Sequence, residues 1–197
     1  MSRLIHVNGN GENVIDFEPV FVRLNNDLSV IDQSLEIVCV GGYVMQLHGY
    51  RGTADIDAFF ESNASIKEII RKVGDEFEIN SPDELWLNNS VSNKNPIPPP
   101  WHREEVYRFS HLTVMKVDII YLLGMKLESG REQDLRDVAA IVKDNNDKQP
   151  LKLFSKLKEI GFNLDISVVI DAFEQVHGME WLERFYIANE SDLRDLY

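Results

Sequence analysis

The sequence predicts an α+β protein in which a mixed β-sheet is flanked by helices and followed by a helical segment. Short runs rich in β-branched residues alternate with apolar residues at helical spacing in the front half of the chain. Residues 145–197 carry helical patterns alone. With 44% apolar and 27% charged residues, a chain of 197 residues can bury a sizeable core, which excludes disorder of the whole chain. We expect one domain over residues 1–144 and a helical extension packed on it over 145–197.

The front half of the chain predicts the order helix, strand, helix, strand, helix. Apolar side chains recur every three or four positions where helices are expected, and β-branched runs stopped by glycine mark the strands. Gly74 is expected to end the third helix, because glycine commonly stops a helix at its C-terminus. The expected elements are a helix within residues 14–35, a strand over 35–40, a short helix over 43–48, a strand over 55–60 and a helix over 66–74.

The middle and the back of the chain predict a loop, a β-segment and several helices. Prolines within residues 77–101 forbid continuous helix and predict a long surface loop. Alternating apolar positions over 106–117 predict one strand or a hairpin. Helical spacing then runs over 119–144 with a break at Ser129-Gly130. Further helices are expected near residues 151–160, 167–177 and 180–189.

Charge and cysteine usage limit the compartment and the partners. Lys and Arg number 20 and Asp and Glu number 33, so the net charge is −13 and opposes non-specific attraction to nucleic acid. A nucleic-acid partner would need a local basic patch. Cys39 is the single cysteine, the first residues lack the apolar core of a signal peptide, and no apolar run approaches the roughly 20 residues that cross a bilayer. We expect a reduced, cytoplasmic protein that does not enter the membrane.

Two carboxylates and a glycine turn form the most informative window. Asp55 and Asp57 are two positions apart in an expected strand, so their side chains share one face about 7 Å apart. Such a pair repels itself unless a cation lies between, and Mg²⁺ takes carboxylate oxygens together with waters and substrate phosphates. Gly41-Gly42 lets the backbone approach a phosphate in front of the next helix. The window therefore predicts a phosphate and a metal in one cleft.

The same window resembles a known family. Val40-Gly41-Gly42, the segment His-Gly-Tyr-Arg-Gly-Thr at 48–53 and Asp55-Ile56-Asp57 look like the opening motif of the nucleotidyltransferase superfold of DNA polymerase β. The bacterial nucleotidyltransferase-like proteins related to the AbiEii abortive-infection toxins are the branch that they resemble. Residues 123–138 resemble the Lys, Arg, Asp, Asp helical motif of that group, and Trp86-Leu87-Asn88 resembles a short element of one uncharacterised branch. The resemblance covers about residues 37–143.

The resemblance implies a metal-dependent nucleotidyltransferase. Its substrates would be a nucleoside triphosphate and an acceptor hydroxyl on tRNA or on a protein, and a toxin-like role would add an antitoxin partner. Lys126 would approach the triphosphate, and Asp134 and Asp137 would line the cleft opposite the Asp-x-Asp pair. The implied catalytic residues are Asp55, Asp57, Lys126, Asp134 and Asp137, with Asp55 and Asp57 holding Mg²⁺ or Mn²⁺. The implied nucleotide-binding residues are Gly41, Gly42, Arg51, Thr53 and Arg131.

Several alternatives stay open at this stage. Tyr43 follows Gly42 where the superfold usually has a serine, so a catalytically silent nucleotide-binding or interaction module competes with an enzyme, and a structural antitoxin-like partner is a third hypothesis. Asp118 is either a third carboxylate or the N-cap of the next helix. Lys126 and its neighbours could instead form a solvated helix face with weak ion pairs. Arg51 could form a salt bridge in place of a phosphate contact.

Overall fold

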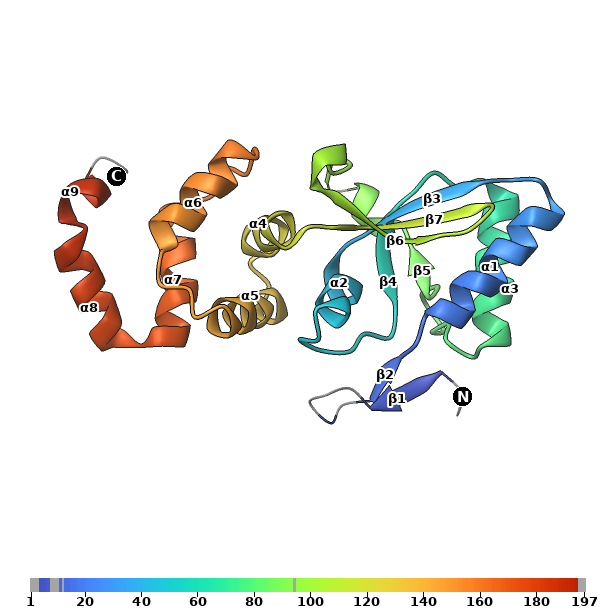
Figure 1. Cartoon of the computed structure of the whole chain (residues 1–197), viewed down its shortest axis with the longest axis horizontal. Coiled ribbons are helices and arrows are strands. Elements are labelled where there is room, and N and C mark those ends of the chain that lie inside the picture. The colour runs from blue at the N-terminus through green and yellow to red at the C-terminus, as the bar shows by residue number, and fades with distance from the viewer. Residues whose placement is uncertain (1–3, 8–10, 12, 94, 195–197) are drawn as a thin grey trace. The chain divides into compact units, whose positions relative to one another are not determined.

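The computed structural model describes residues 4–7, 11, 13–93 and 95–194, and it confirms the predicted α+β class (Figure 1). The chain divides into two compact units, Met1–Asp118 and Ile119–Tyr197. This division falls before the expected boundary between residues 144 and 145. The helices that occupy residues 119–144 pack against helices that follow them, which groups them with the C-terminal part of the chain.

A five-stranded mixed sheet with the order β5-β4-β3-β7-β6 forms the centre of the first unit. The strands are β3 (Leu35–Cys39), β4 (Ile56–Phe59), β5 (Leu87–Asn88), β6 (Arg103–Arg108) and β7 (Leu112–Val117). β3 runs antiparallel to β4 and parallel to β7. The end of β3, the start of β4 and the end of β7 therefore meet at one edge of the sheet, which we call the site edge.

Helices and short elements complete the first unit (Figure 1). These are β1 (Ile5–Val7), β2 (Asn13–Ile15), α1 (Glu18–Val30), α2 (Gly41–Leu47), α3 (Ala64–Glu76) and the 3-10 helices Ser90–Asn93 and Pro100–His102. The pairing of β1 with β2 was not predicted. The helix α1 is shorter than the expected segment, because the first residues of that segment belong to β2. Residues 106–117 are confirmed as part of a hairpin, formed by β6 and β7.

An aromatic cluster fills the space between α1, α2 and the sheet. The ring of Tyr43 lies 5.5 Å from that of Phe17 and 5.9 Å from that of Phe21, measured between centroids. Trp86 lies 5.9 Å from Phe21, and its indole N–H donates to the carbonyl oxygen of Ile70 at 2.9 Å. All four rings are at most 2% exposed, so they form the core beneath the site edge.

The prediction of a surface loop over residues 77–101 is wrong in its middle part. Leu87–Asn88 forms β5, which pairs in parallel with β4, and Trp86 is 1% exposed. Prolines occur at position 82 and from position 96 onward, so residues 86–89 keep the backbone N–H groups that a strand needs.

The prediction that Gly74 ends its helix is also wrong, since α3 continues to Glu76. A Cβ atom at Gly74 would lie 2.1 Å from Asn80 Oδ1 and 2.5 Å from Trp86 Cδ1. The glycine is therefore required by close packing of Asn80 and Trp86 on the helix rather than by a helix stop.

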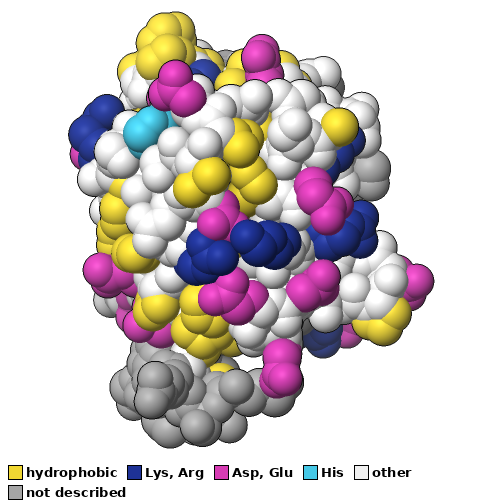
Figure 2. Space-filling model, turned by 90° about the vertical axis from the view of Figure 1, so that its right-hand side faces the viewer, with side chains coloured by type: hydrophobic (Ala, Val, Ile, Leu, Met, Phe, Trp, Pro, Cys, Tyr) yellow, Lys and Arg dark blue, Asp and Glu magenta, His cyan; other side chains and the backbone are white. Residues whose placement is uncertain are grey.

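Charged side chains of α1 and α3 join these two helices on the outer surface. Arg23 Nε donates to Glu76 Oε2 at 2.9 Å, and Lys72 Nζ donates to Asp27 Oδ2 at 3.0 Å. Figure 2, which views the molecule from the right-hand side of Figure 1, shows acidic and basic side chains interspersed on the visible face. Basic side chains there are thus offset by acidic neighbours.

The second unit is helical. Its helices are α4 (Ile119–Ser129), α5 (Glu132–Asp144), α6 (Pro150–Glu159), α7 (Ile166–His177), α8 (Met179–Ala188) and α9 (Glu190–Arg194). The expected break between α4 and α5 is confirmed, and Gly130 there adopts a φ of +62°. α5 packs against α4 and α7, and α6 packs against α7. In the part of the chain that the structure describes, no helix is long and apolar enough to cross a membrane.

Candidate functional site

Gly41 and Asp57 face each other at the site edge. Gly41 is the first residue of α2, and Asp57 lies in β4 next to its start. The amide of Val40 donates to the carbonyl oxygen of Asp57 at 2.9 Å, which continues the pairing of β3 with β4. Gly41 has a φ of +61°, and a Cβ atom on it would lie 3.2 Å from Asp57 Oδ2. Glycine thus supplies the left-handed backbone and leaves the space beside the carboxylate open.

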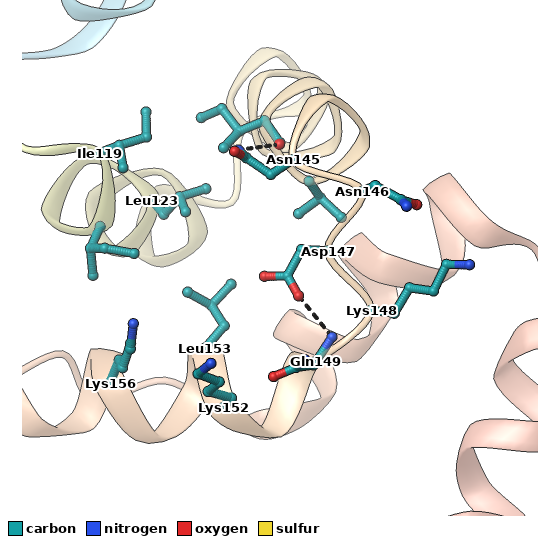
Figure 3. Close-up of a pocket in the computed structure, with 13 residues that line it drawn as sticks. Ile119, Leu123, Asn145, Asn146, Asp147, Lys148, Gln149, Lys152, Leu153 and Lys156 are labelled. Carbon is teal, nitrogen blue, oxygen red and sulfur yellow. Dashed lines mark hydrogen bonds between the residues drawn. The ribbon is translucent and has the colours of Figure 1, made fainter.

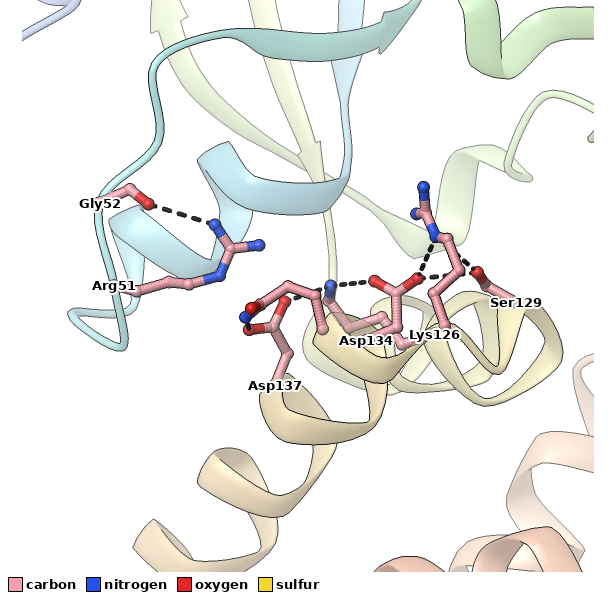
Figure 4. A network of polar contacts seen from close by, with 8 residues as sticks. Arg51, Gly52, Lys126, Ser129, Asp134 and Asp137 are labelled. Carbon is pink, nitrogen blue, oxygen red and sulfur yellow. Dashed lines mark hydrogen bonds and ion pairs between the residues drawn. The ribbon is translucent and has the colours of Figure 1, made fainter.

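Gly42 lies against the segment that leads into β4. A Cβ atom on Gly42 would lie 2.6 Å from Thr53 Oγ1 and 3.2 Å from Arg51 Nη1. Arg51 Nη1 also donates to the carbonyl oxygen of Gly52 at 3.1 Å (Figure 4). The absence of a side chain at position 42 therefore leaves room for Arg51 and Thr53 beside the glycine turn.

Thr53 connects this turn to the first carboxylate. Its Oγ1 lies 3.1 Å from both the carbonyl oxygen and Oδ1 of Asp55, and its backbone N–H donates to Gln46 Oε1 at 3.0 Å. Gln46 in turn donates through Nε2 to the carbonyl oxygen of Ile15 at 2.7 Å. Gln46 therefore positions Thr53, a role that the sequence analysis missed because a single glutamine in a short helix belongs to no motif.

The two aspartates of the site edge influence a neighbouring carboxyl group. Asp55 directly precedes β4, and both it and Asp57 are partly buried. Burial, followed by the charges of Asp55 and Asp57, raises the pKa of Glu84 above its ordinary value. The field of the two carboxylates thus reaches a third acidic side chain.

The donor set of the site edge fits a hard divalent cation that retains most of its own ligands. Carboxylate oxygens are what Mg²⁺ binds, and Mg²⁺ commonly uses one or two of them together with waters and substrate phosphates. Over the described ranges, no group of three or more His, Cys, Asp or Glu side chains is arranged to hold a metal ion by itself. Asp55 and Asp57 could supply one or two carboxylate ligands to such a cation.

Asp118 stands at the same edge, directly after β7. Its Oδ2 lies 2.6 Å from His102 Nδ1, and its backbone N–H donates to the carbonyl oxygen of His102 at 3.0 Å. His102 was missed by the sequence analysis, since it is separated from Asp118 by a whole hairpin. The pair joins the 3-10 helix Pro100–His102 to the end of β7.

His48 and Lys116 form a second polar contact in the first unit. Lys116 Nζ lies 3.3 Å from His48 Nε2 and also forms an ion pair with Glu104. Burial, followed by the charge of Lys116, lowers the pKa of His48. The Lys116 ammonium can only donate, so His48 Nε2 accepts this hydrogen bond, which favours the neutral imidazole.

The motif of the second unit forms a buried ionic network around Lys126 (Figure 4). Lys126 Nζ lies 2.9 Å from Asp134 Oδ1 and 2.6 Å from Asp137 Oδ2. Lys126, Asp134 and Asp137 are 3%, 5% and 3% exposed. The alternative that these residues form a solvated helix face is therefore wrong.

Further donors complete this network. Ser129 Oγ and Arg131 Nε each donate to Asp134 Oδ2 at 2.7 Å, and Gln133 Nε2 donates to Asp137 Oδ1 at 2.9 Å. Burial alone would raise the pKa of Asp134, but hydrogen bonds from Lys126, Ser129 and Arg131 outweigh it and lower that pKa. The network holds the end of α4 against the start of α5.

Comparison with known proteins agrees with the sequence motifs. Residues 17–174 match the model of a family described as "Nucleotidyltransferase of unknown function (DUF6036)". The match includes every residue predicted for the site, from Gly41 to Asp137. No curated protein and no solved structure matches the chain.

Proposed function

The chain belongs to this family of nucleotidyltransferases of unknown function. We propose that an acceptor hydroxyl loses its proton and attacks the α-phosphate of a nucleoside triphosphate, which transfers the nucleotidyl group and releases pyrophosphate. The observation that carries the proposal is the contact of Gly41 with Asp57 at the site edge. It sets a turn that a phosphate can approach closely beside a carboxylate suited to a divalent cation. Transfer then requires positioning and charge stabilisation more than covalent chemistry by the protein.

Asp55 and Asp57 would hold the cation, Mg²⁺ or Mn²⁺. When bound, such an ion neutralises triphosphate charge and makes the attacking hydroxyl a better nucleophile. Thr53 supports this role, because its hydroxyl orients the carboxylate of Asp55 and its own backbone is fixed by Gln46. Gly41 and Gly42 would admit the phosphates, and Arg51 beside Gly42 would supply positive charge to them.

In the network of the second unit, Lys126 and Arg131 would have different roles. Lys126 is buried between Asp134 and Asp137, which favours a positioning role over direct contact with the triphosphate. The Arg131 side chain is 77% exposed while its Nε is fixed on Asp134, so a guanidinium held in place is available to an anionic substrate.

The proposal extends to the acceptor and to the biological role. The resemblance of residues 37–143 to the AbiEii toxins supports an acceptor hydroxyl on tRNA or protein, a toxin-like role and an antitoxin partner.

The first test is calorimetric titration of the four ribonucleoside triphosphates into the protein with and without Mg²⁺. We expect binding that requires Mg²⁺ and that is lost in the double variant Asp55→Asn with Asp57→Asn. A matched control is Asp32→Asn with Asp171→Asn, which removes the same charge from exposed positions outside the site edge. Equal binding in wild type and the site variant, or no binding to wild type, contradicts the proposal.

A catalytically silent nucleotide-binding module is the second candidate function. It is favoured by Tyr43, which stands where the superfold usually offers a serine and is 2% exposed in the aromatic cluster. Triphosphate labelled at its α-phosphate, incubated with total RNA and with a protein extract, separates the two functions. Label transferred by wild type and not by the Asp55→Asn, Asp57→Asn variant supports the enzyme, whereas binding without any transfer supports the silent module.

A further inference from the structure

A groove of about 600 Å³ lies between α4, α5 and α6 of the second unit (Figure 3). Its floor is aliphatic and is formed by Ile119, Ile120, Leu123, Ile141, Val142 and Leu153. Lys148, Lys152 and Lys156 line it as well, and we call it the lysine groove. An aliphatic floor with a basic rim suits a partner that is both apolar and acidic.

The lysines of this groove carry charges that no carboxylate within the described part of the chain pairs with. Lys148, Lys152 and Lys156 form no ion pair within the described ranges, whereas Lys72, Lys116 and Lys126 are paired. Residues 143–158 contain five lysines and two aspartates, although the chain carries a net charge of −13. This segment is thus locally basic.

Two of the three lysines face the groove. Lys152 and Lys156 are four positions apart on α6 and extend from the same side of that helix, whereas Lys148 extends away from them (Figure 3). The acidic residue of the lining, Asp147, accepts a hydrogen bond from the backbone N–H of Gln149 at 2.9 Å. Its charge is therefore partly engaged by the loop that precedes α6.

The outer face of α8 has the complementary character. Met179, Tyr186 and Ile187 are 60%, 42% and 80% exposed, and together with Glu183 they follow the i, i+4, i+7, i+8 pattern of one helix face. The opposite side of α8 is the packed one, because Trp181 stacks on Phe173 of α7 with 6.1 Å between ring centroids. α8 thus presents an apolar stripe with a carboxylate in the middle of it.

We propose that α8 of one molecule docks into the lysine groove of a second copy of this chain. The stripe of Met179, Tyr186 and Ile187 would cover the aliphatic floor, and Glu183 would meet Lys152 and Lys156. Charge complementarity selects this occupant, since one chain carries both an acidic apolar ridge and a basic apolar groove. Contact through a single helix of 10 residues gives weak, concentration-dependent association.

The test is sedimentation velocity over a concentration series at low and at high salt. We expect association at low salt that weakens as salt rises, because charge pairs at the rim are screened. The groove variant Lys152→Glu with Lys156→Glu and the ridge variant Glu183→Lys are each expected to sediment as monomers. Lys67→Glu with Arg71→Glu, four positions apart on the exposed surface of α3, is the matched charge control and should associate as wild type does.

Mixing the two monomeric variants gives the most specific test. The ridge variant keeps the native lysine groove, and the groove variant keeps the native apolar stripe of α8 with Glu183. These native surfaces can bind each other in the mixture, so association should return. A mixture that stays monomeric, a wild-type protein that is monomeric at every concentration, or association that survives both reversals overturns the proposal. Ile187→Ser, which keeps every charge, is expected to weaken association as well, and folding of each variant is checked by circular dichroism.

Discussion

Alanine variants of Gly41 and Gly49 can separate the effect of backbone strain from an effect on nucleotide binding. Both have positive φ, +61° and +78°, so alanine at either position should cost about 1–2 kcal/mol of stability. A Cβ atom at Gly41 would also crowd Asp57, whereas one at Gly49 meets nothing within 4 Å. We expect both variants to lose similar stability in urea denaturation, and triphosphate affinity to fall at least about tenfold in Gly41→Ala alone. Equal affinities would separate Gly41 from the nucleotide site.

We expect substitution of Lys126 to destabilise the protein strongly. Lys126→Ala leaves two buried carboxylates without their shared cation, and breaking a buried pair in this way costs about 3–5 kcal/mol. Arg136→Ala is the control, because Arg136 pairs with Glu132 on the surface and such pairs contribute about 0.3–0.5 kcal/mol. Equilibrium denaturation measures both, and equal losses would show that burial of the network contributes nothing.

The same network predicts a loss of folding stability at low pH. The pKa of Asp134 is lower in the folded protein than its ordinary value of 3.8, so its contribution is fully present above that value and is lost as pH falls through the folded pKa. We expect the free energy of unfolding to fall more steeply below about pH 4 in wild type than in Asp134→Asn, which has no such proton to bind. Parallel pH profiles in urea denaturation would contradict this assignment.

Among the elements, α3 carries the clearest prediction. Alanine at Gly74 would gain about 1 kcal/mol of helix propensity, but its Cβ would clash with Asn80 and with Trp86. Overpacking of a filled site costs about 1–3 kcal/mol, so the net change should be destabilising. Asn80→Ala combined with Gly74→Ala removes one of the two clashes and should recover part of the loss, as measured by thermal unfolding. A stabilised Gly74→Ala protein would refute this packing role.

Sequence spacing predicts those elements whose limits are set locally. The break between α4 and α5 follows from Gly130, and the strand before Gly41 follows from a β-branched run. β5 was missed because two paired residues carry no periodicity, and it forms only because β4 offers an edge. The length of α3 was misjudged because a glycine required by packing and one that ends a helix look alike in sequence.

The sequence likewise predicts some features of the candidate site and not others. Gly41, Gly42, Arg51, Thr53 and the two aspartates lie within 17 positions, and in the structure the glycine turn lies beside the start of β4. The burial of Lys126 was not predictable from spacing, since its partners Asp134 and Asp137 lie on the next helix, beyond the break at Gly130. Partners distant in sequence, such as His102 for Asp118, become visible only when the hairpin between them is folded.

At the scale of the whole molecule, net charge bears on the choice between RNA and protein as the acceptor. A charge of −13 repels phosphates, and the lysine groove supplies positive charge only locally. We expect unstructured single-stranded RNA to bind more weakly than about 10⁻⁴ M at physiological salt, which fluorescence anisotropy measures.

The salt dependence of that measurement decides how to interpret any binding that is seen. Contacts to about three phosphates of a single strand give a slope of about −2 in log K against log salt. Tight binding with such a slope contradicts the expectation for the chain as a whole, and its loss in Lys152→Glu with Lys156→Glu would assign it to the lysine groove. Weak binding with a shallow slope leaves two kinds of acceptor: a protein, or an RNA recognised by its shape and not by its charge.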